Sequence, residues 1–301
     1  MNGRLVEHEL GGLRIMGYSV AGEETVVAAP ELNVCFDVGR APGEILAIDH
    51  VLLSHGHMDH AAGLAYYFSQ RNFIGIAPGT VLLPKALAGP VKELMRVWGA
   101  IEGHVSPAKI VPMAAGETYD LRRGLQVRAF EPNHAVAALG YSVVEVRHKL
   151  KPEFHDRTGP ELVALKKQGV EIEYQLEIPL IAYAGDTAEG QWLELDMVRK
   201  AKVLLLECTF FDPDHVRRAR AGYHLHVRDV ARLLRRLENE HIVLLHVTRR
   251  TGPRDAKQTL ARLVDEATLA RVRFLMEGRR YRPRRDDRTL PEDTPIRGGR
   301  G

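Results

Sequence analysis

The stretch V-L-L-S-H-G-H-M-D-H-A-A-G-L, residues 51–64, decides the fold of this 301-residue chain. Its first three residues are apolar and predict a buried strand, and the run from Ala61 onward predicts a helix. Between them lie His55, His57, Asp59 and His60. Imidazole nitrogens and a carboxylate suit zinc, and a strand end fixes their backbones while leaving the side chains in a cleft. The stretch therefore predicts a metal site at the edge of a sheet.

The spacing within this stretch predicts two ions. His55 and His57 are two residues apart, so both imidazoles can project to one side and bind a single ion. Asp59 and His60 lie at the start of the helix, where they can face a second ion. The alternative is a histidine-rich surface turn, which the density of ligands between a buried strand and a helix disfavours.

Three further candidate ligands stand at the ends of other apolar runs, namely His134, Asp186 and His246. Asp186 follows Gly185, which lets the backbone turn sharply after the run. Taken singly, each could be a core or surface residue. Taken together, they supply the ligands that one short motif lacks for two coordination shells.

Strand-like and helical patterns alternate along the whole chain. The predicted strands are Leu13–Val20, Thr25–Ala29, Val34–Val38, His50–Ser54, Phe73–Ile76, Leu125–Phe130, Gly140–Val146, Leu180–Ala184, Val203–Cys208, Ile242–His246 and Val272–Met276. The predicted helices are Ala61–Ser69, Val91–Ala100, Pro160–Lys167, Gly190–Ala201, Val227–Glu238 and Pro253–Ala267. This alternation of strands and helices suits an αββα sandwich of two mixed sheets flanked by helices, although periodicity equally allows another α/β arrangement.

Composition limits the setting of the protein. No apolar run is long enough for a membrane helix, and the first residues lack a secretory signal. Two cysteines, Cys35 and Cys208, make no disulfide framework, which favours the cytoplasm. We expect one domain over residues 1–278 and a basic, disordered tail over 279–301, where arginines lie among Pro, Gly and Asp.

The motif His55-Gly56-His57-Met58-Asp59-His60 resembles the H-x-H-x-D-H motif of the metallo-β-lactamase superfamily, and Phe36-Asp37-Val38-Gly39 resembles the strand and turn before it. Within the superfamily the chain looks most like ribonuclease Z, the endonuclease that trims tRNA 3′ ends. The segments that carry this narrower resemblance are H-A-V-A-A-L-G-Y (134–141), A-G-D-T (184–187), L-E-C-T-F (206–210) and H-V-T-R-R (246–250).

The resemblance implies a role for each candidate residue. One metal would be held by His55, His57 and His134, and the other by Asp59, His60 and His246, with Asp186 bridging both. We expect two divalent ions, zinc first, although the same ligands accept manganese or iron. The family's Glu–His pair, which assists the leaving oxygen, would be Glu207 and His224, with His226 a rival for the histidine.

The implied reaction is hydrolysis of RNA, at the 3′ end of a tRNA precursor, by a metal-bridged hydroxide. Asp59 would orient the hydroxide and take its proton, and a protonated His224 would neutralise the departing 3′ oxygen. Thr248 and Arg250, beside His246, are expected to contact phosphate. Short ribonuclease Z enzymes are dimers by family pattern, so a homodimer is expected.

One departure from the family concerns how RNA is gripped. Only about forty residues separate Tyr141 from Asp186, and their charged stretch Lys149–Lys167 does not look like the arm with which the family holds tRNA. The sequence therefore points to the basic segment Arg217–Arg220 and the arginine tail as the RNA-binding surfaces.

Two other classes of function compete with this interpretation. The first is a hydrolase of the same superfamily that acts on a small ester, thioester, lactone or cyclic nucleotide. Asp186 and the Glu207/His224 pair favour the phosphodiesterase over it. The second is a non-catalytic, metal-stabilised nucleic-acid-binding protein, which a complete set of ligands disfavours.

Overall fold

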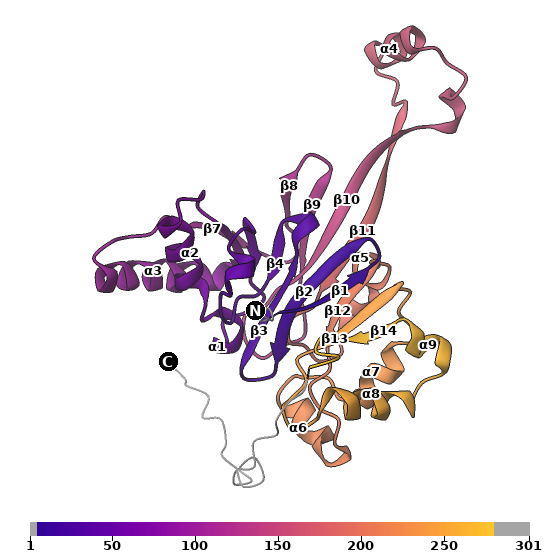
Figure 1. Cartoon of the computed structure of the whole chain (residues 1–301). Helices are drawn as coiled ribbons and strands as arrows, with labels where there is room; N and C mark the ends of the chain where they lie inside the picture. Colours follow the sequence, from indigo (N-terminus) through magenta and orange to yellow (C-terminus); the bar gives the residue numbers. More distant parts are fainter. Residues whose placement is uncertain (1–4, 280–301) are drawn as a thin grey trace.

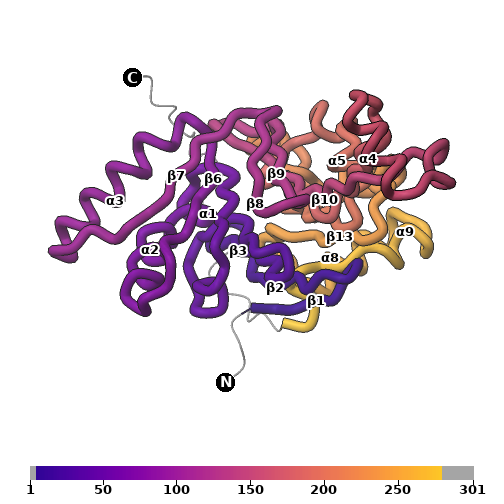
Figure 2. Tube along the Cα trace, turned by 90° about the horizontal axis from the view of Figure 1, so that it is seen from above, coloured from indigo at the N-terminus to yellow at the C-terminus, as the bar shows by residue number. Residues whose placement is uncertain are grey.

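The computed structural model describes residues 5–279 as two seven-stranded sheets packed face to face, with helices on the outside (Figures 1 and 2). The first sheet contains β1 (Val6–Leu10), β2 (Leu13–Val20), β3 (Glu24–Ala29), β4 (Val34–Phe36), β5 (His50–Leu52), β6 (Thr80–Pro84) and β7 (Lys109–Met113). The second contains β8 (Thr118–Arg122), β9 (Leu125–Phe130), β10 (Gly140–Leu150), β11 (Glu173–Tyr183), β12 (Val203–Glu207), β13 (His241–Leu245) and β14 (Val272–Phe274).

Both sheets are mixed and follow the same plan. Strands β1 to β4 pair antiparallel and β4 to β7 parallel. Strands β8 to β11 likewise pair antiparallel, and β11 to β14 parallel. Because parallel neighbours end at the same edge, the loops that follow them gather on one side of the molecule. The expected αββα sandwich is confirmed.

The helices cover the outer faces of the two sheets. On the side of the first sheet are α1 (Met58–Ala61), α2 (Leu64–Phe73) and α3 (Ala88–Glu102). The later ones are α5 (Asp196–Arg199), α6 (Val216–Ala221), α7 (Val227–Leu233), α8 (Pro253–Ala261) and α9 (Glu266–Ala270). Among the described residues, no helix is long and apolar enough to cross a membrane.

The core has two layers. One lies between the sheets and includes the fully buried Phe36, Leu52, Tyr141 and Tyr183. The other lies between the second sheet and its helices and is built around Trp192. The inter-sheet layer matters for function, because it fixes the two sheets whose edges carry the candidate ligands.

A long two-stranded arm projects from the second sheet (Figure 1). Strands β10 and β11 run 11 residues each, and α4 (Gly159–Lys167) sits at the tip. The Thr158 and Glu161 side chains form a capping box at the start of α4. The expectation that this region forms no arm is therefore wrong, because the two strands and α4 together project as one. The helix at the tip was predicted, but the outer strand residues 147–150 and 173–179 were not, because they cover no core and so lack the apolar alternation of a packed strand.

The arm leaves the sheet at a β-bulge. Val143 pairs with Ile181, whereas the next residue, Val144, pairs with Pro179. Leu180 is thus an extra residue on β11, and such an insertion bends the strand and changes its direction.

Most predicted elements occur near their expected positions, but β1, β6, β7, β8 and α6 were not foreseen. The predicted helices Gly190–Ala201 and Pro253–Ala267 are each divided into two shorter helices. The predicted strand Phe73–Ile76 is wrong. Phe73 ends α2, and Gly75 then turns the chain with a φ of 72°. Its apolar residues are exposed rather than part of a sheet, and Phe73 exposes 82% of its surface. The expected tail over 279–301 lies, apart from Arg279, outside the described residues.

Candidate metal centre and active site

The candidate ligands lie in loops at the carboxyl ends of strands from both sheets. His55 and His57 follow β5, and Asp59 and His60 lie on the short helix α1 that comes next. From the second sheet, His134 follows β9, Asp186 follows β11 and His246 follows β13. All seven side chains that the sequence singled out therefore meet at one end of the sandwich.

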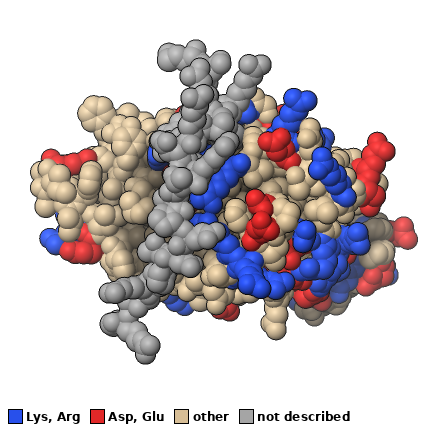
Figure 3. Space-filling model, turned by 90° about the horizontal axis from the view of Figure 1, so that it is seen from below, with Lys and Arg blue, Asp and Glu red and all other residues tan. Residues whose placement is uncertain are grey.

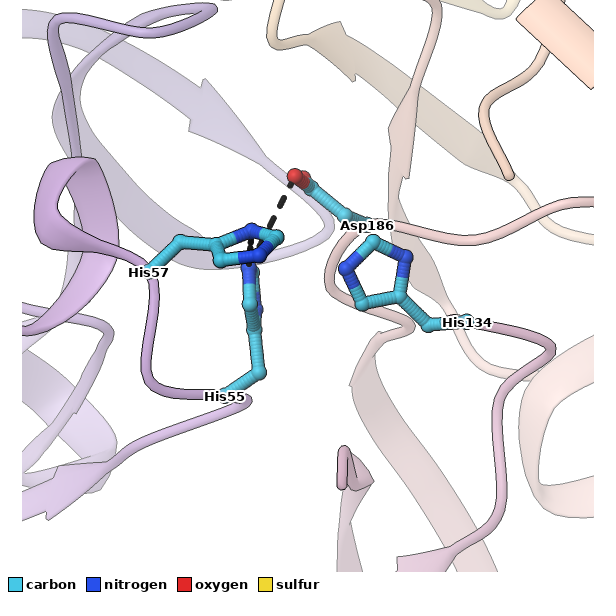
Figure 4. Close-up of side chains that lie close together, drawn as sticks. All are labelled: His55, His57, His134 and Asp186. Carbon is cyan, nitrogen blue, oxygen red and sulfur yellow. Dashed lines mark hydrogen bonds and ion pairs between the residues drawn. The ribbon is translucent and has the colours of Figure 1, made fainter. Parts of the chain in front are cut away.

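One group of possible ligands contains His55, His57, His134 and Asp186, whose ligand atoms all lie within 4.8 Å of one another. Figure 4 shows the three imidazoles and the carboxylate converging on the same space. His55 Nε2 and His57 Nδ1 are 2.9 Å apart. His57 is exposed and His55 fully buried, so this group reaches from the interior to the surface.

A second group contains Asp59, His60 and His246, and Asp186 lies between the two groups. The Oδ2 atom of Asp186 is 3.4 Å from His60 Nε2, 3.5 Å from His246 Nε2 and 3.8 Å from His55 Nε2. One carboxylate thus faces histidines of both groups, which is the position that a bridging ligand requires.

Hydrogen bonds fix which nitrogen three of these histidines present to the site. The Nδ1 atoms of His55, His60 and His246 face Ser54 Oγ at 3.0 Å, Asp37 Oδ2 at 2.7 Å and Thr209 Oγ1 at 3.0 Å, respectively. Each of these oxygens is a carboxylate, or a hydroxyl that already donates to a carboxylate, so it accepts from the ring N–H. In the neutral ring, the Nε2 atom therefore keeps its lone pair for the cluster, as in metal sites where an outer oxygen orients the histidine.

The buried carboxylate of Asp37 is the main outer contact, and sequence reasoning missed it as a functional residue. It accepts hydrogen bonds from the Ser54 backbone N–H (2.6 Å) and hydroxyl (2.7 Å), from the His60 ring (2.7 Å) and from the Tyr183 hydroxyl (2.6 Å). Asp37 also adopts a left-handed φ of 55°. Its place in the strand-and-turn segment 36–39, upstream of the ligand motif, was visible in the sequence, but its contact with Tyr183 of β11 in the other sheet was not.

Glu207 and His224 form a pair next to the cluster. His224 Nδ1 lies 2.8 Å from Glu207 Oε1. Burial lowers the pKa of the His224 imidazole, but the Glu207 carboxylate outweighs this effect and raises the pKa to about 9. The ring is therefore protonated at neutral pH, and its other nitrogen can donate. His224 also forms a group of possible ligands with Asp186 and His246, so it faces the cluster.

Glu207 is itself fully buried and hydrogen-bonded at both oxygens. Besides His224, it accepts from the Thr187 N–H (2.8 Å), the Leu225 N–H (3.2 Å) and the Thr209 hydroxyl (2.6 Å). Thr209 contacts His246 as well, so one threonine links the Glu207/His224 pair to the candidate ligand at the end of β13. Thr209 is a second residue that the sequence did not single out.

The rival histidine, His226, lies elsewhere. It is the N-cap of α7, where its Nδ1 accepts from the Arg228 N–H at 3.2 Å and its Nε2 donates to the Asp212 carbonyl at 2.9 Å. Both ring nitrogens are engaged in holding local structure. The structure thus brings His224, and not His226, to the cluster.

The cluster opens into a cleft of about 570 Å³. His57, Asp59, Asp186, His224 and His246 line its floor, and Thr248, Arg249, Arg250 and Arg218 lie around it. Thr248 and Arg250 therefore stand at the cleft, and their contact with phosphate stays a prediction. Arg249 forms an ion pair with Glu23.

The residues present fit a pair of divalent cations. Both ring nitrogens of His134 and the Oδ1 atom of Asp186 are buried without a hydrogen-bond partner in the described part of the chain. Unpaired buried polar atoms are costly unless they serve a ligand. Burial, together with the neighbouring His60, lowers the pKa of His55 to about 2, which keeps this ring neutral with a free lone pair.

Comparison with known proteins agrees with the arrangement. Residues 27–247 match the family model described as "Beta-lactamase superfamily domain". The chain is 32% identical over 259 residues to tRNase Z TRZ1 of Arabidopsis thaliana, covering 85% of this chain and 92% of that protein. It is also 32% identical over 281 residues to the chloroplastic tRNase Z TRZ2 of the same plant, covering 91% of this chain and 78% of that protein.

Solved structures show the same fold at low sequence identity. The metallo-β-lactamase fold protein YhfI of Bacillus subtilis superposes with a TM-score of 0.59 at 12% identity, covering 85% of this chain and 92% of that one. The short form of human tRNase Z gives a TM-score of 0.50 at 17% identity, covering 81% and 88%. From the matched residues 27–247 and the identity to full-length plant relatives, we conclude that the chain belongs to the metallo-β-lactamase superfamily and, within it, to the tRNase Z family.

Proposed function

We propose that the protein is a metal-dependent endoribonuclease that cleaves tRNA precursors at their 3′ end. The observation that carries this proposal is the contact between His224 and Glu207, 2.8 Å apart, beside a cluster of seven metal-ligand side chains. A site that only bound metal would have no need of a protonated histidine aimed at the cluster. The family relationship to tRNase Z supports the same activity.

The metal ligands are proposed to act in two sets. His55, His57 and His134 would hold one ion, and Asp59, His60 and His246 the other, with Asp186 shared between them. Zinc is the proposed metal because imidazole dominates the donor set. When bound, two such ions supply a water of lowered pKa and neutralise the charge of a phosphate oxygen.

The protein's own side chains would handle the protons. Asp59 lies at the cleft, where its Oδ2 accepts from the Gly22 N–H at 2.8 Å, and it would accept the proton of the attacking water. His224, protonated on Nε2, would donate to the departing 3′ oxygen. Glu207 would hold the imidazolium in place, as its 2.8 Å contact with Nδ1 suits. The products would be a 3′ hydroxyl and a 5′ phosphate.

The molecule offers two regions for holding RNA, the cleft and the arm. Arg218 and Arg250 lie at the cleft and would contact phosphates next to the cut. The arm extends away from the body (Figure 1). We propose that it contacts the tRNA away from the cut.

A comparison of two substrates tests the proposal. The purified protein is incubated with a 3′-extended tRNA precursor and with bis(p-nitrophenyl) phosphate. We expect cleavage of both, with a 3′ hydroxyl on the tRNA product, and loss of both activities in His57→Ala. Activity confined to a non-phosphate ester, thioester or lactone would instead support the small-molecule hydrolase.

We also propose that two copies associate through an apolar face on α2 and α3. In α3, Leu94, Val97, Trp98 and Ile101 are exposed at helical spacing, on a different face from the buried Val91 and Met95. The ends of the two helices lie together, since Asn72 Nδ2 is 2.7 Å from His104 Nε2. This face therefore continues through Phe73, Ile74 and Val105.

An apolar face that continues over two helices differs from the scattered single apolar side chains that monomers normally expose, and such faces mark protein–protein contacts. A second copy is the occupant that this area suits, because a twofold interface uses the same patch on both partners.

A reducing compartment, the cytoplasm, is the proposed location. Both cysteines, Cys35 and Cys208, are unpaired and buried. Burial raises the pKa of the Cys35 and Cys208 thiols, so they stay protonated and act as small apolar side chains.

A further inference from the structure

The short helix α6 carries three exposed arginines, Arg217, Arg218 and Arg220. Within residues 5–279, none of them has a carboxylate or hydrogen-bond partner for its side chain, and the same holds for Arg250 across the cleft. Figure 3 shows lysine and arginine side chains gathered on this lower face of the molecule. Arg218 and Arg250 line the cleft, and Arg217 and Arg220 lie beside Arg218 on the same helix. Free guanidinium groups can bind phosphates without first breaking an ion pair.

The arginines of the neighbouring helices differ among themselves: Arg228 of α7 and Arg254 of α8 have no ion pair among the described residues, whereas others are paired. Arg232 pairs with Glu189 at 2.5 Å, Arg236 pairs with Glu194, and Arg199 pairs with Glu238 at 2.9 Å. Two acidic residues, Asp212 and Asp214, do precede α6, but Asp212 uses a carboxylate oxygen to accept the Asp214 N–H. The arginines of α6 are thus distinguished by lying together, all three unpaired, on one short helix of which Arg218 lines the cleft.

Helix α6 is built into the same segment as the candidate acid. The His224 N–H donates to the Ala219 carbonyl at 2.9 Å, and the Gly222 N–H donates to the Arg218 carbonyl at 3.0 Å. Ala219 is buried, which anchors the helix to the body. Arg218 and His224 line the same cleft. The position of His224 therefore fixes where the arginines of α6 lie relative to a bound phosphodiester.

The connection between His224 and α6 indicates which side of the cut RNA lies along α6. In an in-line displacement, the attacking and leaving oxygens lie on opposite sides of the phosphorus. His224, as the acid, marks the side of the leaving 3′ oxygen, and α6 lies on that same side. We infer that the arginines of α6 bind the phosphates of the RNA on the 5′ side of the cut, which becomes the product with a free 3′ hydroxyl. This inference rests on the proposed function.

Two RNA probes separate the two sides of the cut. The first is a fluorescent stem-loop RNA that ends in a 3′ hydroxyl, and the second is a fluorescent single-stranded RNA with a 5′ phosphate. Binding to the metal-loaded, full-length protein is followed by fluorescence anisotropy at several salt concentrations. The variants are Arg217→Ala, Arg220→Ala and the double variant. Arg123→Ala is the matched control, because Arg123 is exposed on the β8–β9 turn and has no ion-pair partner among the described residues.

We expect the double variant to bind the 3′-hydroxyl RNA roughly tenfold more weakly, with a salt slope smaller by about one for each arginine removed. Its affinity for the 5′-phosphate RNA should stay within about twofold of the wild type, and Arg123→Ala should match the wild type with both probes. Metal content and melting temperature show that the variants are folded. Equal losses with both probes, a loss confined to the 5′-phosphate RNA, or no loss beyond that of Arg123→Ala would each overturn the inference.

Failure of this inference can be distinguished from failure of the proposed function. If the wild type cleaves neither the tRNA precursor nor bis(p-nitrophenyl) phosphate, the proposed activity fails. If the wild type cleaves the precursor but the α6 variants bind both probes as the wild type does, the activity stands and the strand assignment fails.

Discussion

Single hydrogen bonds decide which nitrogen or oxygen each side chain presents to the cluster. The sequence places histidines and aspartates at strand ends, but it does not reveal the contacts that orient them. Asp37 and Thr209 supply those contacts in the structure. The pair at Glu207 shows how local geometry separates two neighbouring histidines, since His224 faces the cluster and His226 caps a helix.

Replacing His224 with alanine should slow phosphodiester cleavage by roughly 10²–10⁴, the typical contribution of a general acid, while two metal equivalents remain bound. His226→Ala is the matched control. This variant should lose about 1 kcal/mol of folding free energy, because the N-cap hydrogen bond is removed, and it should cleave at nearly the wild-type rate. Rates under single-turnover conditions and metal analysis provide the test. Normal cleavage by His224→Ala alongside slow cleavage by His226→Ala would reverse the assignment.

Asp37→Asn should weaken metal binding by roughly 10- to 100-fold, as is usual for outer contacts of metal ligands. The carboxylate accepts four hydrogen bonds, and an amide nitrogen at either oxygen position would face a donor. Tyr183→Phe removes only one of these donors and should have a smaller effect. Affinity is measured by competition with a chelator. If Asp37→Asn binds metal as tightly as the wild type, Asp37 has no part in orienting the ligands.

At the scale of whole elements, the arm is the feature that the sequence concealed. Its ionic contacts are local, for example Lys151 with Glu171 and Lys166 with Glu173. Such charged, self-contained strands resemble a solvated loop in the sequence because period-2 apolar patterning arises from packing against a core. Strands β2 and β9, which face the inter-sheet core, were predicted with their observed bounds.

Replacing residues 152–171 with a tight turn should reduce kcat/KM for the tRNA precursor by about tenfold or more and leave hydrolysis of bis(p-nitrophenyl) phosphate unchanged. The truncation keeps the pairing of Leu150 with Glu173, so the strands can close there. A matched loss of both activities would indicate damage to the site rather than loss of an RNA contact. An unchanged rate with the precursor would show that the arm is not used for binding.

On the scale of the whole molecule, the ligands come from both halves of the chain. The ligands from His55 to His60 follow a strand of the first sheet, and His134, Asp186 and His246 follow strands of the second. Family motifs made this convergence predictable. The apolar face on α2 and α3 was not predictable, because Phe73–Ile76 has the composition of a buried strand and only the structure shows that it is exposed.

Removing metal with a chelator should lower the melting temperature by several degrees. Ions that bind only the folded state stabilise it, by about 2.7 kcal/mol per site at a free metal concentration 100 times the Kd. Differential scanning calorimetry before and after chelation, with zinc added back as the control, provides the measurement. Equal melting temperatures with and without metal would contradict a site that joins the two sheets.

The substitution Ile101→Glu should convert a dimer into a monomer of 33.7 kDa, because it places a charge in the proposed apolar interface. Val163→Glu is the control, since Val163 is exposed on α4 of the arm and lies off the α2–α3 face. Light scattering coupled to size exclusion gives the mass. A monomeric wild type, or a dimeric Ile101→Glu protein, would refute the proposed interface.

The bulge at Leu180 has a consequence for how the arm can evolve. Beyond it, the side chains of β11 alternate in a register that one extra residue has shifted relative to the sheet. Deleting that residue would keep the pairs on either side, Val143 with Ile181 and Val144 with Pro179, and would remove the bend and the added twist between them. The direction of the arm is thus set at its base, separately from the residues at its tip. A single insertion or deletion at the bulge can therefore change the direction of the arm during evolution without changing the residues at the tip.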